Sequence, residues 1–177
     1  MVKSLASCVA LLIVWTTAAC GGAPANTSDR GVAKVAIAGK TFDVSNVEFE
    51  FDAGEGEGGY FRIDGDDAAN PGNDCLPGLS GGLALYGDTP ATITSLAELS
   101  GRELPFEFSG DGDDANLCFA GSNGLLGVDT GTVRFVSVEG SKVTFSFSGT
   151  FTVYDGEGGE SSTPTAASGS GTAYVRQ

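Results

Sequence analysis

Two acidic segments of similar sequence are the first candidates for chemistry in this chain. Their six carboxylates belong to Asp64, Asp66, Asp67, Asp111, Asp113 and Asp114. Carboxylates brought close together repel one another, and a hard divalent cation with six to eight oxygen ligands relieves that repulsion. The pattern therefore suggests Ca²⁺, the one cofactor that the sequence proposes. Two solvated turns, in which each Asp accepts hydrogen bonds from its own backbone, are the simpler interpretation of the same residues.

A third acidic group alternates along one predicted strand. Glu48, Glu50 and Asp52 project from the same face, and two such carboxylates could supply the nucleophile and the acid of a glycosidase. The strand loosely resembles the Glu-x-Asp-x-x-Glu strand of jelly-roll glucanases, although its middle acid is Glu50 and its last acid comes one position early. A solvent-facing strand whose charges deter edge pairing explains these residues without catalysis. We therefore expect no enzyme, and a glycoside hydrolase using Glu48 and Glu50 is the weaker alternative.

Composition excludes several function classes. Histidine is absent from the 177 residues, so there is no Ser-His-Asp triad, no imidazole-ligated metal and no imidazole pH switch. The 23 acidic and 9 basic side chains give a formal net charge of −14. Phosphate binding needs clustered Lys and Arg, so we do not expect nucleic acid as a partner.

The first 19 residues have the form of a secretory signal. Lys3 supplies one positive charge, an apolar run extends from Leu5 to Trp15, and small residues follow. At about 1.5 Å per residue, this run is too short to cross a hydrocarbon core of about 30 Å. We therefore expect this segment to be removed rather than to span a membrane.

The end of this segment, Thr17-Ala18-Ala19-Cys20, resembles the lipobox of bacterial lipoproteins, with Thr17 where that family prefers Leu. In the family, a diacylglycerol is attached to the Cys, and cleavage before it leaves an acylated N-terminus. The resemblance implies a signal peptide at 1–19, a lipid on Cys20, and a flexible tether within 20–31. Gly21 resembles the outer-membrane sorting pattern of lipoproteins in diderm bacteria. The expected location is the cell envelope, anchored in the outer membrane.

Two alternatives remain for the same segment. Leu5-Ala6-Ser7-Cys8 fits the four-residue pattern better than the sequence ending at Cys20, but it leaves no apolar run before the cut. A soluble secreted product is the other alternative.

Two further cysteines, Cys75 and Cys118, remain in the body of the chain. An exported protein meets an oxidising compartment, so we expect a disulfide between them. The bridge would draw the two acidic segments toward one end of the molecule, because one segment precedes each cysteine.

The elements that must position these residues are short strands. Period-2 alternation recurs from Val32 onward, most clearly where Val143, Phe145, Phe147, Phe151 and Val153 face one side and Ser and Thr face the other. A four-residue loop at 139–142 joins this strand to its predecessor in a hairpin. The predicted strands are 32–38, 40–44, 46–52, 59–64, 81–86, 91–95, 104–109, 116–120, 132–138, 143–153 and 171–176.

These elements predict one all-β domain at 32–177. About ten short strands at regular turn spacing favour an antiparallel β-sandwich, with a β-barrel of 8–10 strands as the alternative. A short helical segment is expected at Ser95–Ser100, and a long mobile loop at 155–171.

The expected function follows from the anchor and the fold class. In composition and strand pattern alone, the body of the chain is similar to Gly- and Thr-rich all-β envelope lipoproteins of unknown function. We expect an acidic, non-enzymatic binding or structural domain held on the membrane, whose partner is an unidentified envelope protein or glycan. A calcium-dependent module that binds glycan or protein is the alternative.

Overall fold

The computed structural model describes residues 30–54, 58–71, 74–76, 79–106, 116–119, 125–154 and 164–176. Its eleven strands are β1 (Gly31–Ile37), β2 (Lys40–Asp52), β3 (Gly59–Asp67), β4 (Asp74–Leu76), β5 (Leu79–Ser80), β6 (Gly82–Thr89), β7 (Glu103–Phe106), β8 (Asn116–Cys118), β9 (Leu125–Glu139), β10 (Lys142–Tyr154) and β11 (Thr165–Val175). One short 3-10 helix, η1 (Leu96–Leu99), lies between β6 and β7. The all-β class predicted from the alternation is confirmed.

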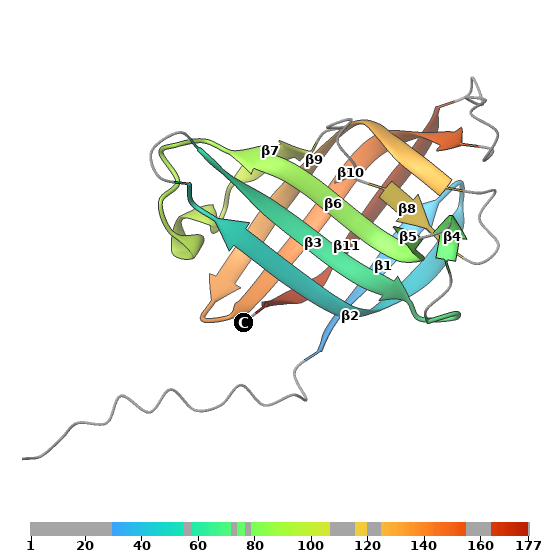
Figure 1. Ribbon diagram of the computed structural model, residues 1–177, viewed down its shortest axis with the longest axis horizontal. Coiled ribbons are helices and arrows are strands. Elements are labelled where there is room, and N and C mark those ends of the chain that lie inside the picture. The colour runs from blue at the N-terminus through green and yellow to red at the C-terminus, as the bar shows by residue number, and fades with distance from the viewer. Residues whose placement is uncertain are drawn as a thin grey trace, which may run out of the picture.

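The strands close into an antiparallel barrel rather than a sandwich (Figure 1). The order β10-β11-β1-β2-β3-β6-β8-β9 returns to its start because β9 also pairs with β10. The first-choice sandwich is therefore wrong, and the alternative barrel is correct. A sandwich and a barrel need the same inward and outward alternation, so only the strand partners distinguish them.

One strand position in the wall is shared by two short strands. β7 pairs with β9 from Arg134 to Gly131, and β8 pairs with β9 at Gly127 and Leu126. Both run antiparallel to β9, so together they form one interrupted strand between β6 and β9. The barrel thus has eight strand positions, and residues 107–115 connect the two halves.

A β-bulge corrects the phase of β2. The pairing with β3 shifts between Ser45 and Glu48, where Asn46 adopts a positive φ of 53°. Val44 and Val47 are both buried although they are three residues apart. The extra residue lets both halves of β2 bury their apolar side chains, so the two strands predicted at 40–44 and 46–52 are one continuous strand.

Two tight turns contain residues with positive φ. Ala38 and Gly39, with φ of 48° and 80°, join β1 to β2. Glu139 pairs with Lys142, so the hairpin between β9 and β10 turns on two residues and is tighter than the four-residue loop that the sequence predicted. Gly140 at its first turn position has a φ of 62°, which favours glycine.

Phenylalanine rings fill the barrel. The ring of Phe135 makes edge contacts with Phe49 and Phe61, at centroid distances of 5.8 Å and 5.2 Å. Phe106 packs against Phe147 and Phe151, at centroid distances of 6.1 Å and 6.0 Å. These contacts join β9 to β2 and β3, and β7 to β10, so the core connects opposite sides of the barrel.

The structure differs from the predicted secondary structure in two segments. Residues 91–95 are not a strand: the backbone turns after Pro90, with Ile93 N donating to Pro90 O at 2.8 Å, and η1 follows where a short helix was expected. The loop predicted for 155–171 is also wrong in its second half, because β11 begins at Thr165. Its inward Gly169 and Gly171 lie so close to Phe147 and Ala33 that an added Cβ would overlap them. Small residues therefore form this strand because large neighbours already occupy the core.

Candidate functional site

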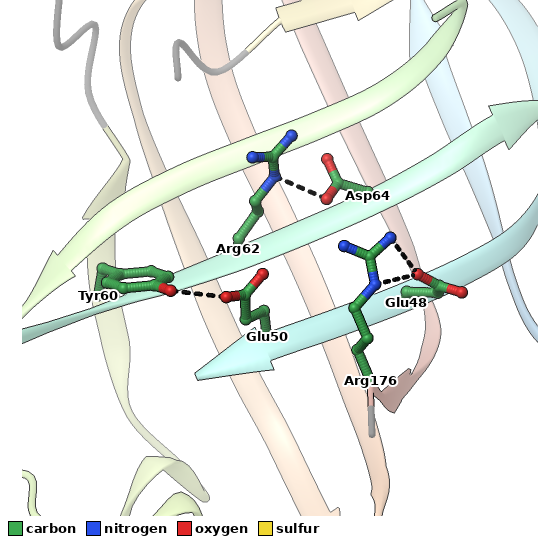
Figure 2. Close-up of polar contacts among 6 residues, drawn as sticks. All are labelled: Glu48, Glu50, Tyr60, Arg62, Asp64 and Arg176. Carbon is green, nitrogen blue, oxygen red and sulfur yellow. Dashed lines mark hydrogen bonds and ion pairs between the residues drawn. The ribbon is translucent and has the colours of Figure 1, made fainter. Parts of the chain in front are cut away.

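The polar residues singled out on β2 lie on an outer surface of the barrel, which we call the charged wall. It comprises the outward side chains of β2, β3 and β6 together with one residue after β11: Glu48, Glu50, Asp52, Tyr60, Arg62, Asp64, Asp66, Tyr86, Asp88 and Arg176. Buried Phe49, Phe61, Ile63 and Leu85 alternate with them and face the core. Figure 2 shows six of these side chains above the strands that carry them.

Two ion pairs connect neighbouring residues of the charged wall (Figure 2). Arg176 approaches the same Glu48 oxygen with Nε at 2.8 Å and with Nη2 at 2.7 Å. Arg62 Nε contacts Asp64 Oδ2 at 2.7 Å along β3. The end of β11 brings Arg176 into place, because Tyr174 and Val175 pair in parallel with Glu48 and Phe49 beyond the start of β1. The end of β11 is thereby fastened to β2.

Two tyrosines stack at the other end of the charged wall. The rings of Tyr60 and Tyr86 lie 5.7 Å apart with 28° between their planes. The Tyr60 hydroxyl donates to Glu50 Oε1 at 2.6 Å (Figure 2). This hydrogen bond to a carboxylate is the main reason that the Tyr60 pKa is raised to about 12, because it stabilises the protonated phenol.

Asp64 lies in the middle of the charged wall and is partly buried. Burial raises the pKa of Asp64, while the guanidinium groups of Arg62 and Arg176 act in the opposite direction. Burial has the larger effect, so the pKa of Asp64 lies above its usual value, and the two guanidinium groups offset only part of the cost of desolvating the carboxylate.

In the glycosidase alternative, Glu48 and Glu50 are the catalytic pair of carboxylates. Both project outward from β2, as the alternation predicted. Glu48 is paired with Arg176, and Glu50 accepts the hydrogen bond from Tyr60. The two groups thus lie beside each other on one strand, whereas glycosidases place carboxylates on either side of the scissile bond. Catalysis by this pair stays an untested alternative.

The three acidic residues expected from β3 in a calcium site do not share one face. Asp66 accepts a hydrogen bond from Asn46 Nδ2 at 2.7 Å, and Asp64 is engaged with Arg62. Asp67 lies on the opposite face of β3, where it is buried and accepts a hydrogen bond from Ala69 N at 2.9 Å, as expected for an Asp-rich turn.

The remaining calcium candidates, Asp111, Asp113 and Asp114, lie outside the described residues. No group of three or more acidic or cysteine side chains that could hold a metal ion occurs within the described ranges. The calcium site therefore stays a prediction.

The lipid and disulfide predictions also stay open. Cys20 precedes the described residues, which begin at residue 30. Cys118 is buried at the end of β8, opposite Gly82 of β6. Cys75 lies in β4, whose hairpin with β5 ends two residues before Gly82. The backbone thus brings the two cysteine segments to the same end of the barrel.

The opposite side of the barrel has a different surface, which we call the hydroxyl wall. Most of its outward residues on β9, β10 and β11 are hydroxyl side chains, with Arg134 and Val136 among the exceptions on β9: Thr130, Thr132, Thr144, Ser146, Ser148, Thr150, Thr152, Ser168, Ser170 and Thr172. A shallow hollow of about 410 Å³ lies on this wall, lined by Thr130, Gly131, Thr132, Ser148, Gly149 and Thr150. Among charged groups there, Asp129 accepts a hydrogen bond from Thr152 at 2.8 Å.

Sequence reasoning found the carboxylates of β2 but missed their partners. Tyr60 contacts Glu50 and stacks on Tyr86 only because β2, β3 and β6 are neighbours, whereas Arg62 pairs with Asp64 on its own strand. The signal was present as a second alternation, Tyr60-x-Arg62-x-Asp64, which becomes informative once its strand is aligned with Glu48-x-Glu50-x-Asp52.

Comparison with known proteins identifies no matching family model, no matching curated protein and no matching solved structure. Among the described residues, no helix has the length and apolar character needed to cross a bilayer.

Proposed function

We propose that this chain is a lipid-anchored, non-enzymatic domain that is held on the bacterial cell envelope by Cys20 and presents the outer walls of its barrel to a partner. One observation chiefly supports binding through a wall: the interior is occupied by packed Phe rings, while the outward residues form an organised set of contacts. Phe49, Phe61 and Phe135 are almost completely buried. Small-molecule sites are usually concave and largely apolar, so a filled barrel favours recognition at its surface.

The anchor is supported by residues of the sequence. Lys3, the apolar run that follows it and the small residues before Cys20 match the order of a lipoprotein signal. Two or three acyl chains, at about 0.8 kcal/mol per buried CH₂, would hold the domain stably at a membrane.

The test of the anchor uses the full chain expressed in a diderm bacterium. We expect the mature N-terminal peptide to begin at Cys20 with the added mass of a diacylglycerol and acyl chain. Cys20→Ser should abolish the added mass and release the protein from the membrane fraction. Cys8→Ser is the matched control, since it removes the other signal-segment cysteine and should change neither result. Acylation lost in Cys8→Ser and kept in Cys20→Ser would refute the assignment.

The non-enzymatic part is tested with a panel of glycans. The purified full chain should release no product, and Glu50→Gln should not differ from the parent. Turnover by the parent that Glu50→Gln abolishes would replace this proposal with the glycosidase.

A calcium-dependent module is kept as the second candidate because of one feature of the register. Asp64 pairs with Ala84, and Ala84 pairs with Asn116, so Asp64 and Asn116 lie in the same row of the sheet. Asn116 closely follows the second acidic group in the sequence. A rise of Tm in Ca²⁺ that equal ionic strength of Mg²⁺ does not reproduce would support it. Equal melting curves in Ca²⁺, Mg²⁺ and EDTA would count against it.

A further inference from the structure

The tyrosine end of the charged wall has an unusual arrangement of charge across three strands. In one row Asp52 of β2 pairs with Tyr60 of β3, and Tyr60 pairs with Asp88 of β6. In the next row Glu50, Arg62 and Tyr86 are aligned in the same way. Tyr60 is therefore bordered by a carboxylate on each side, while Arg62 lies between Glu50 and Tyr86.

Within the described part of the chain, Glu50, Asp52 and Asp88 form no ion pair. Arg62 lies opposite Glu50 but its ion pair is with Asp64, and Arg176 pairs with Glu48. Glu50 accepts from the Tyr60 hydroxyl, and Asp52 Oδ1 accepts from Gly54 N at 2.9 Å. Both contacts are hydrogen bonds to neutral donors, so the negative charge around the tyrosine pair persists.

Aromatic faces and carboxylates together favour a cation. An ammonium or guanidinium group is attracted to the face of a tyrosine ring and forms charge-assisted hydrogen bonds with carboxylates. The chain as a whole carries a net charge of −14, which attracts a basic partner from a distance. An anionic glycan would be repelled by the same field.

The spacing of the carboxylates favours an extended polypeptide. Glu50 and Asp52 lie two residues apart on one strand face, and Tyr86 and Asp88 do the same on β6. Alternate residues of any extended chain recur at about 6.8 Å, so basic side chains at every second position would match this repeat.

We propose that the tyrosine end of the charged wall binds Lys or Arg side chains of an extended basic segment in a partner polypeptide. The inference rests on the proposed function only in requiring that the wall is displayed to a partner. The four residues that carry it are Asp52, Tyr60, Tyr86 and Asp88.

The test measures binding of a fluorescent peptide, acetyl-Lys-Ser-Lys-Ser-Lys-amide, to the full chain by anisotropy. The double substitution Asp52→Asn and Asp88→Asn should weaken binding about fivefold to tenfold, and Tyr86→Leu about twofold to fivefold. Tyr86→Phe keeps the ring and should bind like the parent. The matched control, Asp129→Asn with Glu139→Gln, removes the same charge elsewhere on the barrel and should change the Kd by less than about twofold. Tyrosine ring signals in NMR spectra should shift for Tyr60 and Tyr86 and stay constant for Tyr174.

Two results would overturn the inference. Equal weakening in the two double variants would mean that the peptide responds only to net charge. Absence of peptide binding to the parent chain would exclude the site outright. Circular dichroism of each variant shows whether it is folded, and the mass of the Cys20 peptide in the same preparation reports separately on the proposed anchor.

Discussion

The charged wall and the hydroxyl wall occupy opposite sides of one barrel and obey the same alternation. On both, every second residue enters the core, where Phe49 and Phe61 from one side meet Phe135 from the other. Their outward residues differ: one side joins carboxylates, guanidinium groups and tyrosines through specific contacts, and the other presents mainly Ser and Thr.

This difference shows which surface properties the fold leaves open. Inward positions are constrained by packing, because every cavity or overlap in the core costs stability. Outward positions have no such constraint, and exposed ion pairs such as Arg176 with Glu48 add little stability. The two walls can therefore differ in chemistry while the core that they share stays the same.

The largest expected loss of stability comes from removing the core contact that joins the two sides of the barrel. Phe135→Ala removes the ring that contacts Phe49 and Phe61, and it should lower the free energy of unfolding by about 3–5 kcal/mol. Chemical denaturation monitored by circular dichroism measures this. Val136→Ala, at an outward position that is 53% exposed, is the control and should change stability by less than about 0.5 kcal/mol. Similar losses in both variants would show that the barrel does not depend on this contact.

A smaller effect is expected where the hydroxyl wall meets the core. A Cβ at Gly131 would overlap the ring of Phe106, so Gly131→Ala should destabilise the fold by about 1–3 kcal/mol. Thr132→Ala changes the neighbouring outward position and should have little effect on the melting temperature. An unchanged melting temperature for Gly131→Ala would indicate that Phe106 can move aside.

Removal of an ion pair from the charged wall should have a modest effect. The Arg176 and Glu48 side chains are 59% and 49% exposed, so Arg176→Met should cost only about 0.2–1 kcal/mol, and less at high salt. Lys34→Met is the control, because its pair with Asp43 is still more exposed, at 71% and 68%. We expect the smaller loss there. A loss for Arg176→Met that salt does not reduce would point to packing of its stem instead.

The smallest expected effect is spectroscopic. The pKa of Tyr60 is raised from 10.0 to about 12, so the folded protein holds this proton more tightly than the unfolded chain does. The resulting stabilisation is complete below pH 10.0 and is lost as the pH rises through about 12. Ultraviolet difference titration should show one late phenolate transition that Tyr60→Phe removes.

Glu50→Gln replaces the carboxylate that accepts the Tyr60 hydrogen bond and should shift the same transition to lower pH. Asp129→Asn on the hydroxyl side should leave it in place. A late transition that survives Tyr60→Phe would belong to another residue and contradict the assignment.

The candidate site was only partly predictable. The position of Glu48, Glu50 and Asp52 on one face follows from period-2 alternation, a local property of the chain. The contacts with Tyr60 and Arg176 do not, because they depend on which strands are neighbours: Glu50 and Tyr60 are ten residues apart, and Glu48 and Arg176 are 128 apart.

The sequence by itself determined the all-β class and the inward face of the most regular strand. Val143, Phe145, Phe147 and Phe151 are buried as predicted, since alternation of apolar and hydroxyl residues leaves only one face for a core. The absence of histidine likewise limits the available chemistry, whichever way the strands pair.

Only the tertiary structure decided that the sheet closes, that β7 and β8 share one position, and that β11 begins at Thr165. Strand partners are set by contacts distant in sequence, which no local pattern records. The small residues of β11 resemble a loop when read alone. They form a strand because Phe147 and Ala33 from its two neighbours leave space for nothing larger than glycine at Gly169 and Gly171.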